Sequence, residues 1–492
     1  MQQLIKYSKI FRQLNFKSIK FFESKLYDCP RKATRDIKDG STILVGGYGL
    51  CGVPQNLINA IKMNGTTGLI VVSNNCGTKD QGLGVLLHQH QIRRMITSQI
   101  GDNQEFERQY LKGELEVEFV PQGTLAEKCR AAGHGIPAFY TNAGCQTMVE
   151  MGGAVIKYMK GSKESEIISE PKERRNFHGK DYIMEKSIKG DFALIKAQKA
   201  DKYGNLVFNR SSRNFNVDMG TAANIVIAEV EEIVENGQIE PDYVHLPGVF
   251  VNRIFKSEKP INTIQNLILH EEYELTQVDH QLKILQRAAK EIKHGMFVNF
   301  GYGLPIQTIQ HVPKNIEFEV HSENGVMGVG KYPSQGAQNA DLINANHESI
   351  TLNPGASIFS SSLSFGMARG GHLDLVILEA MQISENGDLA NWIIPGKTIR
   401  GMSGDMDLAN SGSKVIALTE HVASNGRQKL VSFCKYPLTA KGVVDMIITD
   451  KAVFQKINGK FVLTEIAKES NLEDIRKNTG FQFNVDSNVR SF

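Results

Sequence analysis

A short pattern of residues occurs twice along this chain. Residues 37–61 read IKDGSTILVGGYGLCGVPQNLINAI, and residues 292–309 read IKHGMFVNFGYGLPIQTI. In both, a turn glycine precedes a short apolar run, a Gly-Tyr-Gly loop and a proline that could begin a helix. The turn glycines lie 255 residues apart and the loop glycines 254 apart. Two copies of one strand–loop–helix unit at a nearly constant separation predict a duplicated domain.

A second pair of segments supports the duplication. Residues 190–206 read GDFALIKAQKADKYGNL, and residues 371–389 read GHLDLVILEAMQISENGDL. Each predicts a buried strand that ends near an alanine, with a turn glycine seven residues later. The two copies follow the first pair in the same order, so the whole domain is predicted to be repeated.

Nearly continuous apolar runs indicate the fold class. Residues 69–72, 224–230 and 415–418 are of this kind. Such strands are covered on both faces, which predicts a largely parallel sheet packed between helices. The fold class is therefore α/β, with two related open α/β domains joined by a polar linker. We expect the ligand site at the interface of these domains.

The amino-terminal segment differs from the rest of the chain in charge. Residues 1–22 hold five basic side chains, no acidic one and several intervening apolar side chains. A basic, amphipathic and acid-poor helix is typical of an organelle transit peptide. We expect a mitochondrial transit peptide and a location in the mitochondrial matrix. The alternative is a basic helix that the mature protein keeps.

These features divide the chain into five parts. We expect a transit peptide over 1–28, an amino-terminal domain over 29–255, a linker over 256–281, a carboxyl-terminal domain over 282–483 and a tail over 484–492.

Composition argues against several classes of function. The 56 basic and 53 acidic residues give a net charge of only +3, so nothing favours nucleic-acid binding. No apolar run reaches the roughly 18 residues that a membrane span needs. No cysteine pair has C-x-x-C spacing, which argues against a zinc site and a disulfide framework. His88 and His90 alternate as metal ligands on a strand could, but no nearby Cys, Asp or Glu completes a site, so we expect no metal.

The first glycine loop also matches a dinucleotide-binding fingerprint. Residues 47–52, GYGLCG, satisfy G-x-G-x-x-G after a predicted strand. A ribose-binding Asp or Glu should then end the next strand, but 69–72 run into Ser-Asn-Asn, and the second loop lacks the third glycine. We therefore favour a role in which the glycines let the backbone approach a bulky ligand or a neighbouring loop.

One carboxylate stands out in the second half. The alternating segment 316–321, IEFEVH, predicts a strand, and Asn324-Gly325 predicts a tight turn just after it. Glu323 is thus expected at a strand end beside glycines. It could cap the turn through backbone N–H groups, or it could act as a covalent nucleophile.

At this point the chain resembles a known family, the family I coenzyme A transferases. The first family motif appears as Asp39-Gly40 through GGYGLCGVP, and the second as residues 321–325, HSENG. The resemblance runs from about residue 30 to about residue 483, through SNNCG, PQGTLAEKCRA, GIPAFYT, RNFN, ADLINA, PGAS and GDLANW. It implies that the two halves correspond to α and β subunits that other members keep as separate chains. A homodimer is expected on the same ground.

The resemblance also implies an activity. It is the transfer of CoA from succinyl-CoA to a 3-oxo acid such as acetoacetate, as in ketone-body breakdown, without a permanently bound cofactor. Glu323 would attack the thioester, forming an acyl-glutamyl anhydride and then a glutamyl–CoA thioester, which gives ping-pong kinetics. Other acid substrates such as acetate, or a catalytically weak paralogue that serves binding or assembly, are the alternatives.

Family roles carry over to individual positions. Asn299 matches the amide near the reacting carbonyl, where it would orient the substrate or an oxyanion. Asn74 and Gln122 match the residues that meet the acid substrate from the first half, and Gly404 matches a backbone donor there. Amides suit this task because they bind a carboxylate without adding charge. Each of them could instead serve only turn and loop hydrogen bonding.

Several positions depart from the family pattern. After ADLINA the family usually has Gly-Lys, whereas this chain has Asn346 and His347. Glu379 replaces the glycine of a family Leu-Gly-Ala run, and Ser403 and Asp405 alter a Gly-Met-Gly-Gly-Ala run. Two added acids and a lost cation should weaken the binding of an anionic substrate. His347 is the expected substitute for the lysine on the CoA side, although a histidine is mostly neutral at matrix pH.

Overall fold

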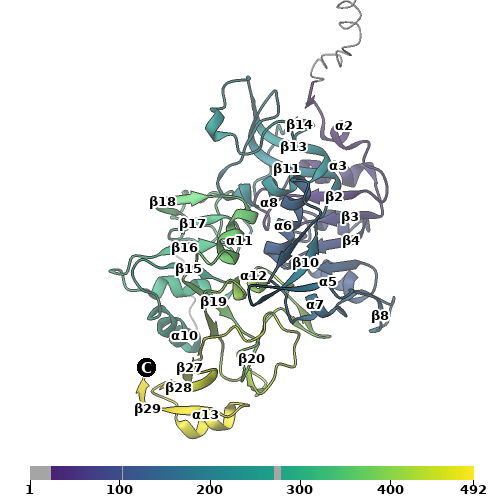
Figure 1. The fold of residues 1–492 in the computed structure, drawn as a ribbon. Helices are drawn as coiled ribbons and strands as arrows, with labels where there is room; N and C mark the ends of the chain where they lie inside the picture. Colours follow the sequence, from purple (N-terminus) through teal and green to yellow (C-terminus); the bar gives the residue numbers. More distant parts are fainter. Residues whose placement is uncertain (1–23, 102, 271–278) are drawn as a thin grey trace, which may run out of the picture.

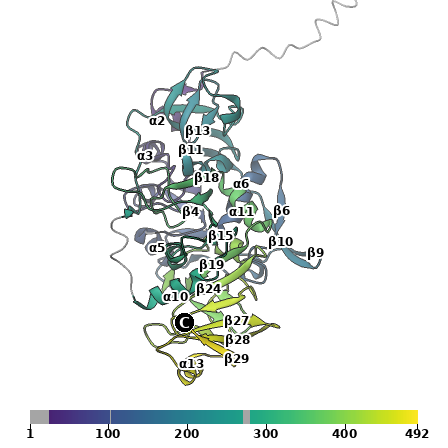
Figure 2. The same cartoon turned by 90° about the vertical axis from the view of Figure 1, so that its left-hand side faces the viewer.

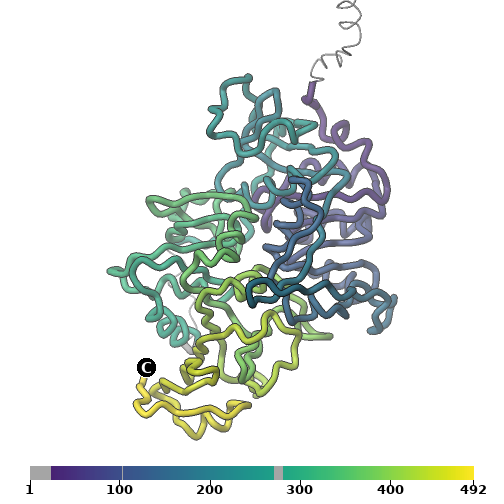
Figure 3. Tube along the Cα trace, in the orientation of Figure 1, coloured from purple at the N-terminus to yellow at the C-terminus, as the bar shows by residue number. Residues whose placement is uncertain are grey.

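The computed structural model describes residues 24–101, 103–270 and 279–492 of the chain. Most of the expected transit peptide, residues 1–23, and part of the expected linker, 271–278, lie outside the described residues. Figures 1 and 3 show two lobes that follow the sequence, the first coloured purple to teal and the second green to yellow.

The first lobe is built on a nine-stranded sheet. Its main path runs in spatial order through β1 (Leu26–Tyr27), β14 (Arg253–Lys256), β13 (Ala223–Val234), β11 (Gly190–Asp201), β2 (Thr42–Val45), β3 (Leu69–Val72), β4 (Ile92–Thr97) and β5 (Glu116–Phe119). Every pairing on this path is parallel. The ninth strand, β12 (Leu206–Val207), pairs antiparallel with β11.

The second lobe is built on a ten-stranded mixed sheet. Its order is β18 (Leu352–Ile358), β17 (Val326–Val329), β16 (Glu319–Ser322), β15 (Phe297–Phe300), β19 (Leu375–Glu379), β24 (Lys414–Leu418), β26 (Met446–Ile448), β27 (Ala452–Ile457), β28 (Lys460–Ile466) and β29 (Asn484–Ser491). Small sheets flank it, formed by β20 (Gln382–Ser384), β21 (Leu389–Ala390) and β25 (Leu430–Val431), and by β22 (Ile393–Ile394) and β23 (Thr398–Ile399).

The two sheets share a five-strand parallel core, as a duplication requires. In the first lobe the order is β3-β2-β11-β13-β14, and in the second it is β16-β15-β19-β24-β26. All four pairings are parallel in both cores. The repeated glycine-loop segments contain β2 and β15, and the second repeated pair contains β11 and β19. The duplication predicted from these four segments is therefore confirmed.

Helices cover both faces of each core. In the first lobe, Ile43 and Val45 of β2 face a cluster with α3 (Gln55–Asn64), whereas Leu44 faces the opposite cluster with α6 (Gln122–Gly133) and α8 (Asn214–Met219). The second lobe packs α10 (Asp279–Ala289) on one face and α11 (Ser361–Arg369) with α12 (Asp405–Ala409) on the other. This two-sided burial explains the nearly unbroken apolar runs of these strands.

Further short elements complete the first lobe. They are the helices α2 (Pro30–Thr34), α4 (Gly84–Leu87), α5 (Gln104–Leu111) and α7 (Met148–Met151), the 3₁₀ turns η1 (Arg210–Arg213) and η2 (Pro241–Tyr243), and the strands β6 (Ala138–Thr141), β7 (Val155–Tyr158), β8 (Ser165–Ile168), β9 (Arg174–Phe177) and β10 (Lys180–Lys186).

The lobes meet through their inner helices. Helix α11 of the second lobe contacts α6 and α8 of the first, and α12 contacts α6. Asp218 of α8 accepts hydrogen bonds from the backbone N–H (3.0 Å) and the hydroxyl (2.6 Å) of Ser362 in α11. A small apolar cluster that includes Cys145 and Met406 also joins the two lobes. Figure 2 shows α6 and α11 side by side between the two sheets.

The structure differs from the sequence-based expectations in two details. The helix expected after the second glycine loop is a 3₁₀ helix, η3 (Leu304–His311), whereas the first copy has the α-helix α3. Residues 484–491, assigned to a tail, instead form β29, which pairs parallel with β28. Helix α13 (Leu472–Asn478) precedes it, so the carboxyl-terminal segment adds an edge strand to the second sheet.

Candidate active site

The site lies where strands of both sheets end. Asn74 follows β3, and Gln122 opens α6 just after β5. In the second lobe, Asn299 is on β15 and Glu323 directly follows β16. All four side chains are at most 1% exposed. Ligands of open α/β sheets bind at the carboxyl ends of the strands, and both sheets present these ends here.

A glycine turn places Glu323. The N–H of Gly325 donates to the carbonyl of Ser322 at 3.0 Å, and Gly325 has φ +103°. A Cβ atom at this position would lie 2.2 Å from the carbonyl oxygen of Phe359. Only glycine therefore fits the turn. Neither carboxylate oxygen of Glu323 has a hydrogen-bond partner of good geometry among the described residues, and the only backbone group that favours its charged form is its own N–H, so Glu323 does not cap the rest of the turn.

The carboxyl group of Glu323 is held without a partner in a buried place. Burial raises the pKa of Glu323 to about 7, and the negative charge of Asp405 adds to the shift. A buried polar group without a hydrogen bond is costly and calls for an explanation. At neutral pH a large share of such groups would be ionised and weakly solvated, which suits a nucleophile.

Asn299 is fixed by a buried histidine. Its Nδ2 donates to His321 Nδ1 at 2.9 Å and to the His321 carbonyl at 3.2 Å, and its Oδ1 has no partner. The other ring nitrogen of His321 lies 2.9 Å from the hydroxyl of Ser364, which in turn donates to the Ser322 carbonyl at 3.3 Å. Burial lowers the pKa of His321 to about 4, so the ring is neutral. Asn299 is close enough to favour the charged form of Glu323, although both of its N–H groups point to His321.

Asn74 and Gln122 form one unit. Gln122 donates from Nε2 to Asn74 Oδ1 at 2.8 Å, which leaves Asn74 Nδ2 and Gln122 Oε1 unpaired and buried. The backbone N–H of Gln122 donates to the Ser403 carbonyl at 2.9 Å, across the boundary of the lobes. Gly404 follows, and a Cβ atom there would lie 3.3 Å from Gln122 Oε1. The structure therefore brings Gly404 next to the first-lobe amides.

His347 joins the two glycine loops. Its ring packs edge-on against Tyr48 of the first loop, with centroids 5.0 Å apart, and lies 6.3 Å from the ring of Tyr302 in the second. A Cβ atom at Gly49, where φ is +57°, would lie 2.7 Å from His347 Cδ2. The Tyr48 hydroxyl donates to the Ala345 carbonyl at 3.0 Å. The first glycine loop thus serves the close approach of a neighbouring loop, as the sequence indicated.

A cavity of about 390 Å³ lies beside this cluster. Four of the five positions that depart from the family pattern line it, namely His347, Glu379, Ser403 and Asp405. The fifth, Asn346, contacts a lining residue, because Asn346 Oδ1 accepts a hydrogen bond from the N–H of Gly303 at 2.9 Å. Departures that lie up to 59 residues apart in the sequence therefore meet at one place.

The cavity is acidic. Its lining includes Glu107, Glu379 and Asp405, with Arg400 as a cation. Arg400 lies 3.6 Å from Glu379, so this cation is already paired. Asp405 is 8% exposed, its Oδ2 accepts from Asn391, and its Oδ1 is unpaired.

All the predicted site residues thus gather in one region, and the sequence missed three that belong with them. His321 accepts a hydrogen bond from Asn299, and Ser364 bonds to His321. Tyr48 donates to the loop carbonyl of Ala345. His321 and Tyr48 belong to the quoted motifs and lie next to strand ends, so this position in the sequence could have identified them as site residues. Nothing in the sequence singled out Ser364.

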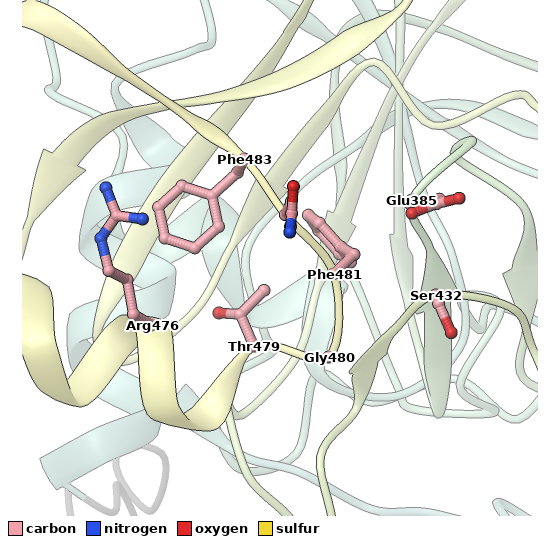
Figure 4. A pocket seen from close by; sticks show the side chains of 8 residues that line it. Glu385, Ser432, Arg476, Thr479, Gly480, Phe481 and Phe483 are labelled. Carbon is pink, nitrogen blue, oxygen red and sulfur yellow. The ribbon is translucent and has the colours of Figure 1, made fainter.

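Other surface features carry no comparable chemistry. Figure 4 shows a hollow of about 460 Å³ near α13, in which Arg476 stacks over the ring of Phe483 at 5.4 Å. No residue expected at the catalytic centre lines it. His88 and His90 are exposed. In the described ranges no three His, Cys, Asp or Glu residues are grouped to hold a metal, and no helix is long and apolar enough to cross a bilayer.

Comparison with known proteins agrees with this geometry. The family model described as Coenzyme A transferase matches residues 28–257 and 282–478. The human protein named succinyl-CoA:3-ketoacid coenzyme A transferase 2, mitochondrial, is 44% identical over 472 residues, which is 95% of this chain and 91% of the human one. A relative from Helicobacter pylori (strain J99), named as one subunit of a succinyl-CoA:3-ketoacid coenzyme A transferase, is 51% identical over 228 residues, covering 46% of this chain and 90% of the bacterial one.

The fold is shared with a solved structure. The acyl-CoA transferase YdiF of Escherichia coli O157:H7 superposes with a TM-score of 0.77 over 95% of both chains, at 20% identity. The duplicated fold is therefore that of a CoA transferase, and a bacterial relative keeps as a separate chain what corresponds to about half of this one. With a family match across both lobes, the chain belongs to the coenzyme A transferase family of enzymes.

Proposed function

We propose that this enzyme transfers CoA from succinyl-CoA to a 3-oxo acid such as acetoacetate, with Glu323 as the covalent carrier. The observation that carries the proposal is the buried Glu323 carboxyl, which has two unpaired oxygens and stands among unpaired amide atoms of both lobes. The substrates follow from the human relative's name and from its 44% identity over most of both chains.

The first half of the reaction conserves the thioester energy on the enzyme. The ionised Glu323 attacks the thioester carbonyl, and the C–S bond breaks, giving an acyl-glutamyl anhydride and the CoA thiolate. The thiolate then attacks the glutamyl carbonyl, releasing the free acid and leaving a glutamyl–CoA thioester. The second acid reverses these steps, so the kinetics are ping-pong.

The surroundings of Glu323 suit these steps. An anhydride reacts with water, and burial of Glu323 keeps water away. Asn74 Nδ2 is an unpaired donor that can hold the carboxylate of the acid substrate. Gly404 adjoins Gln122, which supports assigning it the role of a backbone donor there. Contacts to the remote parts of CoA can supply the binding energy that offsets anhydride formation.

The orientation of Asn299 refines its role. Because both N–H groups point to His321, an oxyanion would have to compete with His321 for a donor. We propose that Asn299 mainly orients Glu323 and the reacting carbonyl, and that its free Oδ1 accepts a hydrogen bond when Glu323 is protonated.

A mass measurement tests the covalent role. The enzyme is incubated with succinyl-CoA, digested and analysed for a CoA adduct on the peptide that contains Glu323. The expected adduct is absent from Glu323→Ala, which should fold and yet retain less than a hundredth of wild-type exchange. Activity above that level would refute the role of Glu323.

A different acid preference is the second candidate, and one observation favours it. Glu379 places a carboxylate on the cavity beside the proposed nucleophile, where a dicarboxylic acyl group would be repelled. Initial rates with acetoacetate and with acetate as acceptors separate the two candidates. A catalytically weak paralogue would show no adduct with either.

We also propose a mitochondrial location and a homodimer. The basic, acid-poor segment 1–22 and the human relative's name support the first. Fusion of residues 1–28 to a fluorescent protein tests it, because a cytosolic signal would contradict it. The dimer rests on the family resemblance, and sedimentation equilibrium of the mature chain tests it.

A further inference from the structure

Asp405 is a second buried carboxyl group next to the nucleophile. It opens α12, and its Oδ2 is held by the side-chain amide of Asn391. Its Oδ1 has no hydrogen-bond partner and would lie 3.3 Å from a Cβ atom at Gly301. The free oxygen therefore faces the second glycine loop, and Asp405 itself lines the cavity.

Several charged or titratable groups surround Asp405. Glu323 and Glu379 repel its negative charge, Arg400 attracts it, and the neutral Tyr48 lies within reach of its field, which raises the pKa of that phenol. His347 lines the same cavity. Burial raises the pKa of Asp405 to about 7, and Glu379 adds to the shift. Two neighbouring buried carboxyl groups resist simultaneous ionisation, so the Glu323–Asp405 pair tends to keep one proton.

The reaction produces an anion at this place. In the proposed reaction the CoA thiolate departs from the acyl group at Glu323, and the cation that lines the adjoining cavity, Arg400, is already paired with Glu379 at 3.6 Å. No buried lysine or arginine lines the cavity in the described part of the chain. A proton donor would stabilise the departing sulfur where a cation is not available.

We propose that Asp405 is an acid–base catalyst of the transfer, with its unpaired Oδ1 exchanging a proton with the sulfur of CoA. As the C–S bond breaks, Asp405 gives its proton to the thiolate and becomes a carboxylate, and CoA waits as a thiol beside the anhydride. When the thiol attacks the glutamyl carbonyl, Asp405 takes the proton back. Each half-reaction returns Asp405 to its starting form, so no proton is gained or lost.

Other acids near the site are less suited to this step. Glu379 is about one-third exposed and paired with Arg400. Asp407 accepts hydrogen bonds from the Gly123 N–H and the Thr124 hydroxyl. His321 has both ring nitrogens engaged, with Asn299 and Ser364. Asp405 combines burial, a free oxygen and a place on the cavity wall.

The pH profile of kcat/KM with succinyl-CoA and acetoacetate tests the inference. The wild type needs an ionised Glu323 and a protonated Asp405, so its profile should be bell-shaped. In Asp405→Asn we expect the rate at the optimum to fall by roughly 100-fold. The falling limb at high pH should disappear, and Asp405→Glu should restore it. If Asp405→Asn does not fold, Asp405→Ala serves instead, because the smaller side chain fits without strain. Its profile should also lose the falling limb.

Controls separate this inference from the proposed function on which it rests. Asp218→Asn removes another buried acid, whose pKa burial raises to about 7, but which binds Ser362 away from the cavity. It should keep the falling limb. If wild-type enzyme forms no Glu323 adduct, the proposed function fails. If the adduct forms and Asp405→Asn keeps both the falling limb and a rate within about threefold of wild type, only the role of Asp405 is overturned.

Discussion

Asn299 donates its side-chain amide to Nδ1 of His321 at 2.9 Å, and this bond leaves its carbonyl oxygen free near Glu323. His321 is itself held by Ser364 at 2.9 Å. A chain of three buried side chains thus sets the orientation of an amide that neighbours Glu323. The electrostatic balance at Glu323 depends on that orientation.

Replacing Asn299 by aspartate should therefore disturb the nucleophile. A carboxylate cannot donate to His321 and adds a like charge near Glu323, which raises the pKa of Glu323 further. We expect the exchange rate at pH 7 to fall by roughly 100-fold and the rising limb of the pH–rate profile to move to higher pH. Asn299→Ala removes the amide, which favours the charged form of Glu323, without adding a charge, so its limb should move in the same direction but by less. Identical pH profiles for the two variants would contradict the electrostatic account.

The buried carboxyl of Glu323 should cost stability at neutral pH. Because its pKa is raised in the folded state, from 4.5 to about 7, the folded chain binds the proton more tightly than the unfolded chain. The free energy of unfolding is then unaffected well below pH 4.5, falls between about pH 4.5 and pH 7, and levels off above pH 7. The loss at pH 8 amounts to roughly 3 kcal/mol.

Glu323→Gln should remove this loss. We expect the variant to match the wild type in urea unfolding at pH 5 and to be the more stable protein at pH 8. Glu385→Gln, at the distant hollow of Figure 4, serves as the control and should show no such pH-dependent gain. A wild type as stable as Glu323→Gln at pH 8 would show that Glu323 finds a partner in solution.

The sequence predicted the parts of this molecule that depend on local pattern. The turn at Gly325, the strand ends and the duplicated order of β2 with β11 and of β15 with β19 follow from glycine placement and apolar runs. Glu323 could be chosen because it stands at a strand end beside glycines, which leave space around its side chain. The family resemblance then gave it a role.

Relationships across the lobes could not be predicted in this way. Spacing along the chain does not show that Asp218 meets Ser362, or that Gln122 donates its backbone N–H to Ser403. The meeting of His347 with Asp405 at one cavity depends on how distant segments of the second lobe pack against each other. The 3₁₀ form of η3 and the edge strand β29 likewise depend on packing against neighbours, which overrides local preference.

Asp407 of the second lobe binds α6 next to Gln122. This fully buried carboxylate accepts from the Gly123 N–H at 2.8 Å and lies 3.6 Å from an Arg369 nitrogen, so it ties α6 to the second lobe. Asp407→Ala leaves the N–H without an acceptor and should lower the free energy of unfolding by about 3 kcal/mol. Because Gln122 precedes Gly123, exchange activity should fall as well.

Asp407→Asn is the matched variant, since its amide oxygen can still accept from Gly123. We expect it to lose less stability and to keep most of the activity. Chemical unfolding and steady-state exchange measure the two effects. Equal losses in the two variants would mean that the charge of Asp407 next to Arg369, a pair within the second lobe, matters more than its hydrogen bond to α6.

The acidic lining of the cavity should limit the use of a dicarboxylic acyl group. Glu379 lies on this cavity with its Oε2 against the second glycine loop, 2.5 Å from where a Cβ atom of Gly303 would be. The charge of Glu379 should cost the free carboxylate of a succinyl group about 1 kcal/mol of binding in this partly solvated cavity. Glu379→Gln should therefore raise kcat/KM for succinyl-CoA roughly fivefold. The gain for acetoacetyl-CoA, whose acyl tail carries no charge, should be smaller.

Added salt should shrink the difference between the two substrates, because it screens charges at the mouth. A fall in kcat/KM for succinyl-CoA instead would show that the pair of Glu379 and Arg400 orients this substrate, and the comparison with Arg400→Gln would then show the same fall.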